Sequence, residues 1–173
     1  MNDLVDVLIE DVRWNSIGLT KLAESSVKSV LSIFDLDSDS YAVSLLGCDD
    51  ARIAGLNNEF RAKTAPTNVL SWPASDLGRP KPDQPPYLPP NGSSEKPYEL
   101  GDIAISFDTC WRESKETGQD FTGHVAHLLV HGTLHLFGYD HIVIQEAAEM
   151  ENLERQALAI MGYRDPYGDI DRL

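Results

Sequence analysis

All five histidines of this 173-residue chain lie in one stretch, His124-Val-Ala-His127-Leu-Leu-Val-His131-Gly-Thr-Leu-His135-Leu-Phe-Gly138-Tyr-Asp140-His141. Neutral imidazole is the commonest protein ligand for a transition metal. His131 and His135 are four residues apart, so on a helix they stand one above the other, about 6 Å apart, and both rings can reach one ion. The spacing therefore predicts a metal site on a helix that covers residues 120–137.

A third ligand has to come from beyond this helix, because the next turn lies too far along the axis. Gly138 stands where a helix ends in a left-handed residue, which glycine adopts at little cost. His141 follows three residues later and can approach the ion from a second direction. Three histidines leave one tetrahedral position open, as in catalytic zinc sites. Ordinary surface or core histidines are the alternative, which the intervening glycine and the neighbouring Asp140 make less favourable.

The same spacing occurs in the metzincin peptidases, His-Glu-x-x-His-x-x-Gly-x-x-His. The peptidases use the glutamate as general base, and Gly132 stands at its position. The ligands are thus predicted without the peptidase base. Gly132 lies on the helix side that carries apolar residues, so we expect another segment to pack closely there. The alternative is a glycine that is tolerated near a helix end.

His124 and His127 share the helix face of His131 and His135. All four cannot bind one ion together with His141. We expect them to support the ligands or to line the cleft, unless they are only packed or solvated.

Composition and charge narrow the class of protein. The net charge is −14, whereas proteins that bind nucleic acid directly usually have a basic surface. Contact with nucleic acid would therefore be local, through a few arginines, a metal ion or a partner. A hydrophobic content of 42% over 173 residues predicts one folded domain, residues 1–173.

Targeting signals and cysteine usage indicate a cytoplasmic protein. No apolar run approaches the roughly 20 residues of a membrane span. The first residues are acidic and lack the basic region of a signal peptide. Cys48 and Cys110 form no Cys-x-x-Cys pair, so we expect free thiols in a reducing compartment.

Hydrophobic periodicity predicts an α+β fold with a small mixed four-stranded sheet and about five helices, one of them a zincin-like metal helix. The expected strands cover residues 3–9, 41–47, 68–73 and 100–106. The expected helices cover residues 18–34, 49–60, 107–117, 120–137 and 145–161.

Two further segments carry specific expectations. Residues 75–97 are rich in proline, and a loop of this length is expected to be mobile. The last helix is expected to pack through Met150, Leu153, Ala157 and Ile160. Its glutamates are expected to form a solvated face rather than to bind metal. These are Glu146, Glu149, Glu151 and Glu154.

The histidine segment resembles the signature of the YbeY family, bacterial metal-dependent endoribonucleases of ribosomal RNA maturation. The likeness runs from about residue 40 to 167, and the supporting stretches are Leu56-Asn57 with Phe60-Arg61, Pro66-Thr-Asn-Val-Leu-Ser-Trp-Pro73, Leu100-Gly-Asp-Ile-Ala-Ile-Ser106 and Met161-Gly-Tyr-Arg-Asp-Pro-Tyr167. Three features depart from the family pattern. Asn68 replaces an aspartate, so a charge pairing there is expected to be lost, Trp72 replaces a phenylalanine, and the 75–97 loop is longer.

The resemblance implies that His131, His135 and His141 bind one zinc ion and that Arg61 is the functional arginine of the cleft. A guanidinium matches phosphate oxygens and stabilises developing negative charge. The implied enzyme is a zinc-dependent, single-strand-specific endoribonuclease, a hydrolase that matures the 3′ end of small-subunit ribosomal RNA and serves ribosome quality control. Its implied partners are single-stranded ribosomal RNA and the ribosome or small subunit with its proteins. Docking on proteins of such a particle would compensate for the electrostatic repulsion between the acidic chain and RNA.

Two other hypotheses stay open at this point. One is a metallohydrolase of another substrate, including a peptidase, against which Gly132 argues. The other is a non-catalytic, zinc-stabilised ribosome assembly factor, whose metal would hold the fold together. Imidazole ligands also accept nickel, copper or iron. No general base is evident, and both metal-bound water and the ribose 2′-hydroxyl remain candidate nucleophiles.

Overall fold

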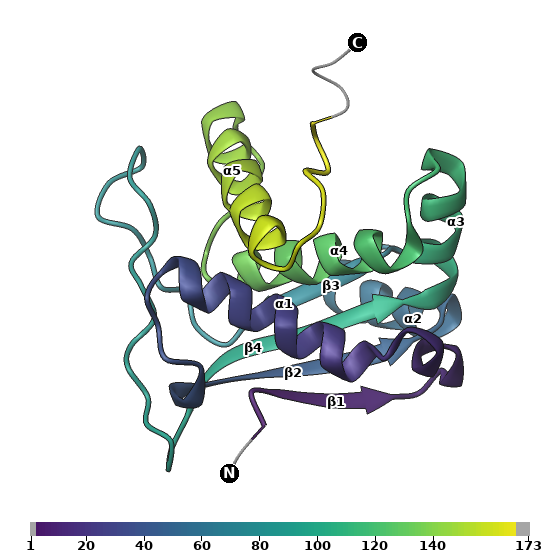
Figure 1. Cartoon of the computed structure of the whole chain (residues 1–173), viewed down its shortest axis with the longest axis horizontal. Helices are drawn as coiled ribbons and strands as arrows, with labels where there is room; N and C mark the ends of the chain where they lie inside the picture. The colour runs from purple at the N-terminus through teal and green to yellow at the C-terminus, as the bar shows by residue number, and fades with distance from the viewer. Residues whose placement is uncertain (1–2, 169–173) are drawn as a thin grey trace.

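The computed structural model describes residues 3–168, and their four strands form one mixed sheet (Figure 1). The strands are β1 Val5–Ile9, β2 Tyr41–Cys48, β3 Val69–Pro73 and β4 Tyr98–Ser106. Their order is β1-β2-β4-β3; β1, β2 and β4 are parallel, and β3 pairs antiparallel with β4. This arrangement confirms the predicted α+β fold with a small mixed sheet.

The helices begin and end within one residue of their predicted limits. They are α1 Leu19–Ile33, α2 Asp50–Arg61, α3 Phe107–Thr117, α4 Phe121–Leu136 and α5 Ile144–Ile160, with short 3-10 turns η1 Val12–Ile17 and η2 Ser38–Ser40. Aspartate side chains cap the N-termini of α2 and α4. Asp49 accepts a hydrogen bond from the backbone N–H of Arg52, and Asp120 accepts one from the backbone N–H of Gly123. Because these capping residues are adjacent to the helix ends, the helix limits can be predicted from the sequence.

The two faces of the sheet carry different helices. Val43 and Ile103 belong to the main core with residues of α1, α4 and α5, while Ala104 packs with Ile53 of α2. Because successive residues of a strand point to opposite faces, α2 covers the face away from α1 and α4. Figure 1 shows α1 and α4 lying side by side along the sheet, with α5 rising from the end of α4.

Gly132 lets α4 approach the sheet closely, as expected from its place on the apolar side. A Cβ atom there would lie 3.0 Å from the Oγ atom of Ser71 on β3 and 3.4 Å from the Cδ1 atom of Ile103 on β4. The edge of the sheet and the metal helix are thereby fixed relative to each other.

Replacing Gly132 with leucine should therefore lower the melting temperature by about 4–8 °C, because added side-chain atoms overpack this contact. Gly55→Ala on α2 is the matched control, since a Cβ there meets nothing within 4 Å. It should raise the melting temperature by about 1–4 °C through helix propensity. Thermal unfolding followed by circular dichroism measures both, and equal shifts in the two variants would contradict the close contact at residue 132.

The proline-rich loop contains no helix or strand, as predicted, but it contacts the rest of the chain. Tyr41 donates a hydrogen bond to Asn91, and Arg79 lies 3.6 Å from Glu146 at the start of α5. Pro86 packs beside Gly138. The loop thus touches the chain on both sides of His141, and its mobility stays a prediction.

Two predictions for α5 are wrong. Ile160 is 59% exposed, and Leu158 is buried instead. Glu154 was expected to face solvent, yet it is only 1% exposed. The buried stripe of α5 is Met150, Glu154, Ala157 and Leu158. Glu154 occupies this stripe because it meets polar partners on α4.

Two expectations from composition can be compared directly with the structure. Cys48 and Cys110 are both free and buried. Among the described residues, no helix is long and apolar enough to cross a membrane.

Candidate metal centre

The structure brings together the three predicted ligands at the C-terminal end of α4. The Nε2 atoms of His131 and His135 are 3.0 Å apart. The ring of His141 lies 5.4 Å from that of His131 and 5.3 Å from that of His135, centroid to centroid. One nitrogen from each histidine lies within 4.8 Å of the other two, so the group could hold a metal ion.

The turn after α4 delivers His141. Gly138 has a φ of 94°, a left-handed conformation that favours glycine, and its N–H donates to the carbonyl oxygen of His135. Asp140 lies beside His141 and accepts from its backbone N–H at 2.7 Å. The side chain of His141 is 59% exposed, so solvent and substrate can reach the centre.

The two helix histidines are held in orientations that suit a cation. His131 donates from Nδ1 to Glu154 at 2.7 Å, and His135 donates from Nδ1 to the carbonyl oxygen of Tyr139 at 2.9 Å. With hydrogens on both Nδ1 atoms, the Nε2 atoms face each other as lone-pair acceptors, an arrangement that only a shared cation or proton makes favourable. Burial, with the nearby His131, lowers the pKa of His135 to about 4, which keeps its imidazole neutral near pH 7. The residues present therefore fit a metal ion.

Glu154 is the centre of a buried network beneath the ligands. Its carboxylate accepts hydrogen bonds from His127 at 2.7 Å, from His131 at 2.7 Å and from the Tyr167 hydroxyl at 2.6 Å. Burial alone would raise the pKa of Glu154, but the hydrogen bonds from His127 and His131 lower it to about 2. The ionised carboxylate orients His131 and places negative charge where it supports a bound cation.

Sequence reasoning missed both Glu154 and Tyr167. A signal for Glu154 existed, because it follows Met150 by four residues and therefore lies on the apolar stripe of α5. A charged residue in such a stripe requires a partner. Tyr167 belongs to a stretch that resembled the family, but nothing in the sequence showed that its hydroxyl reaches α4.

His124 belongs to a separate network that also includes Asn68. The carboxylate of Glu113 lies 3.0 Å from Nε2 of His124 and accepts from the amide of Asn68 at 3.0 Å. Asn68 therefore contacts a charged group, and an aspartate there would repel Glu113. Of the two upstream histidines, His127 supports a ligand through Glu154, whereas His124 is anchored to α3.

Arg61 lies on the exposed last turn of α2. This helix covers the face of the sheet away from α4. Among residues 3–168, the Arg61 side chain takes part in no hydrogen bond or ion pair. The structure therefore unites the three histidines but shows no contact between them and the predicted arginine.

Fold and site together define an α+β protein with three histidines grouped at the end of a buried helix, where they could hold a metal ion. The chain matches the family model "Endoribonuclease YbeY" over residues 7–162 and belongs to this family.

Named relatives cover nearly the whole chain. It is 49% identical to Endoribonuclease YbeY of Ruegeria sp. (strain TM1040), over 95% of this chain and 96% of the relative. It is 46% identical to the protein of the same name from Cereibacter sphaeroides, over 96% of this chain and 100% of the relative. A solution structure from Thermotoga maritima covers 94% of this chain and 97% of its own, with a TM-score of 0.54 at 17% identity, which supports the fold.

Proposed function

We propose that this chain is a zinc-dependent endoribonuclease that cleaves single-stranded RNA. The observation that carries the proposal is the convergence of His131, His135 and His141, with both helix histidines held at Nδ1 so that Nε2 is free to bind. The name of its relatives supports RNA as the substrate. Three imidazoles with one open position are the ligand set of a catalytic zinc ion.

The residues divide into those that bind the ion and those that act around it. When bound, the ion polarises a phosphoryl oxygen and lowers the pKa of a coordinated water. His131, His135 and His141 would hold it, and Glu154 and the Tyr139 carbonyl keep the helix histidines in their binding orientation. Arg61 is the proposed contact to the scissile phosphate, because its guanidinium is a fixed fork that matches phosphate oxygens.

The proposed substrate is ribosomal RNA in the cytoplasm, with processing of the 3′ end of small-subunit RNA and ribosome quality control as the roles. The similarity of the histidine segment to the family signature supports this choice. A chain of net charge −14 repels free RNA at long range. Docking on proteins of the small subunit would supply binding affinity that compensates for this repulsion.

Gly132 weighs against the peptidase alternative. A side chain at this position would be directed at Ser71 and Ile103 of the sheet. A glutamate placed there would press its Cβ atom against both of these side chains. Residue 132, at the position where peptidases carry the catalytic glutamate, therefore packs against the sheet in this chain.

Arg61→Ala should reduce cleavage of a single-stranded RNA by about 100-fold or more, as expected when a group that stabilises transition-state charge is removed. Arg52→Ala is the matched control, because Arg52 lies on the same helix and pairs with Glu10. Initial rates are measured with zinc-loaded protein, and a casein digest run alongside tests the peptidase alternative. Equal cleavage by the two variants would remove Arg61 from the mechanism, and casein cleavage would contradict the proposed substrate.

The assembly-factor alternative makes a different prediction for the metal. If zinc only holds the fold, stripping it should unfold the chain. We expect the stripped protein to keep its circular dichroism spectrum, because the main core of the sheet, α1, α4 and α5 is built without the ion.

A further inference from the structure

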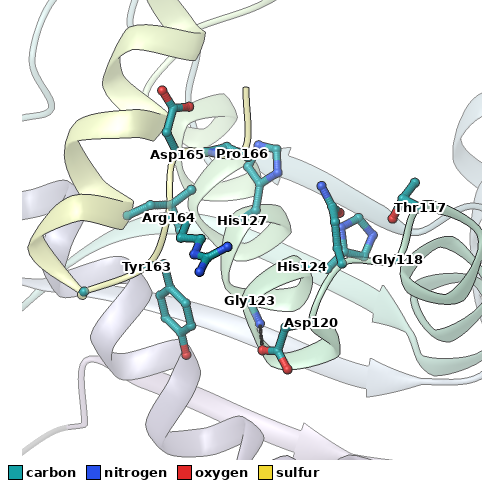
Figure 2. Close-up of a pocket in the computed structure, with 13 residues that line it drawn as sticks. Thr117, Gly118, Asp120, Gly123, His124, His127, Tyr163, Arg164, Asp165 and Pro166 are labelled. Atoms are coloured by element: carbon teal, nitrogen blue, oxygen red, sulfur yellow. Dashed lines mark hydrogen bonds between the residues drawn. The ribbon is translucent and has the colours of Figure 1, made fainter. Parts of the chain in front are cut away.

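A pocket lies along α4, toward its N-terminal end and apart from the three grouped histidines. It has a volume of about 420 Å³, within the range of ligand sites. His124 and His127 of α4 form one side, residues 117–120 before α4 form another, and residues 162–166 after α5 form the third (Figure 2). None of the three metal ligands lines this pocket.

Arg164 supplies an uncommitted positive charge to the pocket. The two carboxylates that line it are already engaged. Asp165 pairs with Arg155 at 3.1 Å, and Asp120 accepts from the backbone N–H of Gly123 at 3.0 Å. Arg164 is exposed and, within residues 3–168, forms no hydrogen bond or ion pair. In a chain of strongly negative charge, this guanidinium is available to bind an anion.

Aromatic rings from two elements line the same pocket. His124 and His127 come from α4, and Tyr163 comes from the segment after α5 (Figure 2). Histidine and tyrosine rings are surfaces on which unpaired bases stack. His124 also has a buried Nδ1 atom with no hydrogen-bond partner among the described residues.

His127 links this pocket to the metal centre. It lines the pocket and also donates to Glu154, which orients His131. His127 and His131 are one turn apart, a rise of about 6 Å along the helix. The pocket wall at His127 therefore lies about one helical turn from the ligand His131.

We propose that this pocket binds a nucleotide that neighbours the scissile phosphate of single-stranded RNA. The base stacks on the rings of His124 and Tyr163, and a backbone phosphate pairs with Arg164. A base can enter only when it is unpaired, so the pocket accounts for selection of single strands over duplexes. The inference rests on the proposed function and adds a binding site for the same substrate.

The test measures binding of a fluorescent single-stranded RNA of about ten nucleotides, a length within the range that single-strand sites cover. Metal-stripped protein is used so that no cleavage occurs. Arg164→Gln should weaken binding about fivefold, as expected for loss of one exposed charge pair. It should also flatten the dependence of log K on log salt by about 0.7, the contribution of one phosphate contact. Lys21→Gln removes an equal charge from an exposed site on α1 and should leave the salt dependence unchanged.

A second pair of variants tests the stacking surface. His124→Leu and His124→Phe both lose the contact with Glu113, so a difference between them reports the aromatic ring. Leucine should weaken binding about fivefold or more, and phenylalanine should retain it. A duplex of the same sequence should compete poorly against the labelled strand.

Two results would overturn the inference while leaving the proposed function intact. In both, zinc-loaded wild-type protein cleaves the RNA. In the first, the Arg164→Gln and Lys21→Gln variants bind the RNA with the same affinity and the same salt dependence. In the second, the His124→Leu and His124→Phe variants bind the RNA equally well. If the wild-type protein neither binds nor cleaves single-stranded RNA, the proposed function itself fails, and the pocket assignment with it.

Discussion

His135→Ala should abolish metal binding and RNA cleavage together. His135 is the middle ligand, with its Nε2 atom 3.0 Å from that of His131 and its ring 5.3 Å from that of His141. Removing it leaves two ligands, one of them on an exposed turn, which cannot form the predicted site. We expect the metal content to fall from about one ion per chain to near zero, because a three-ligand zinc site depends on each ligand.

Thermal unfolding gives this prediction a readout that does not depend on activity. A ligand present at 100 times its Kd stabilises the folded state by about 2.7 kcal/mol, which is about 5–11 °C for a chain of this size. Added zinc should raise the melting temperature of metal-stripped wild type by that amount and leave His135→Ala unchanged. Gln145→Ala, at an exposed position early in α5, should respond like wild type. A full zinc-induced shift in His135→Ala would place the ion elsewhere.

Glu154→Gln should weaken zinc binding by about 10–100-fold, the usual effect of removing a partner that orients a ligand histidine. Three donors converge on the two carboxylate oxygens, from His127, His131 and Tyr167. Glutamine keeps the shape but offers one oxygen, and its amide group must face one of those donors. The free energy of unfolding should fall by about 2–3 kcal/mol, since hydrogen bonds to a buried charge are lost.

Competition with a chelator measures the zinc affinity, and denaturant unfolding measures the stability. Glu149→Gln is the control on the same helix; Glu149 is not buried, and its side chain forms no hydrogen bond or ion pair among the described residues. It should change neither quantity appreciably. The role assigned to Glu154 is contradicted if both variants bind zinc with wild-type affinity.

Features that depend on interactions between residues close in the sequence could be predicted from the sequence. The limits of α4 depend on Asp120 and on the turn at Gly138, and both signals lie at the helix ends. The grouping of the three histidines could be predicted because His131 and His135 share one helix face and His141 follows within six residues. Gly132 was placed correctly because helical periodicity shows which side of α4 is apolar.

Other features depend on how distant elements meet. Periodicity within α5 could place Glu154 on the apolar stripe, but its partners His127 and His131 follow only from the packing of α5 against α4. The contact of Asn68 with Glu113 joins the start of β3 to α3, 45 residues away in the chain. The position of α2 on the opposite face of the sheet follows from sheet topology.

The most direct test of the account is a titration of metal-stripped protein with zinc while the cleavage rate of a single-stranded RNA is measured. The rate should rise in proportion to added zinc and level off at one equivalent per chain, with no rise for His135→Ala. Full cleavage by stripped wild-type protein, or an equal rise in His135→Ala, would contradict the claim that the three histidines hold the ion on which catalysis depends.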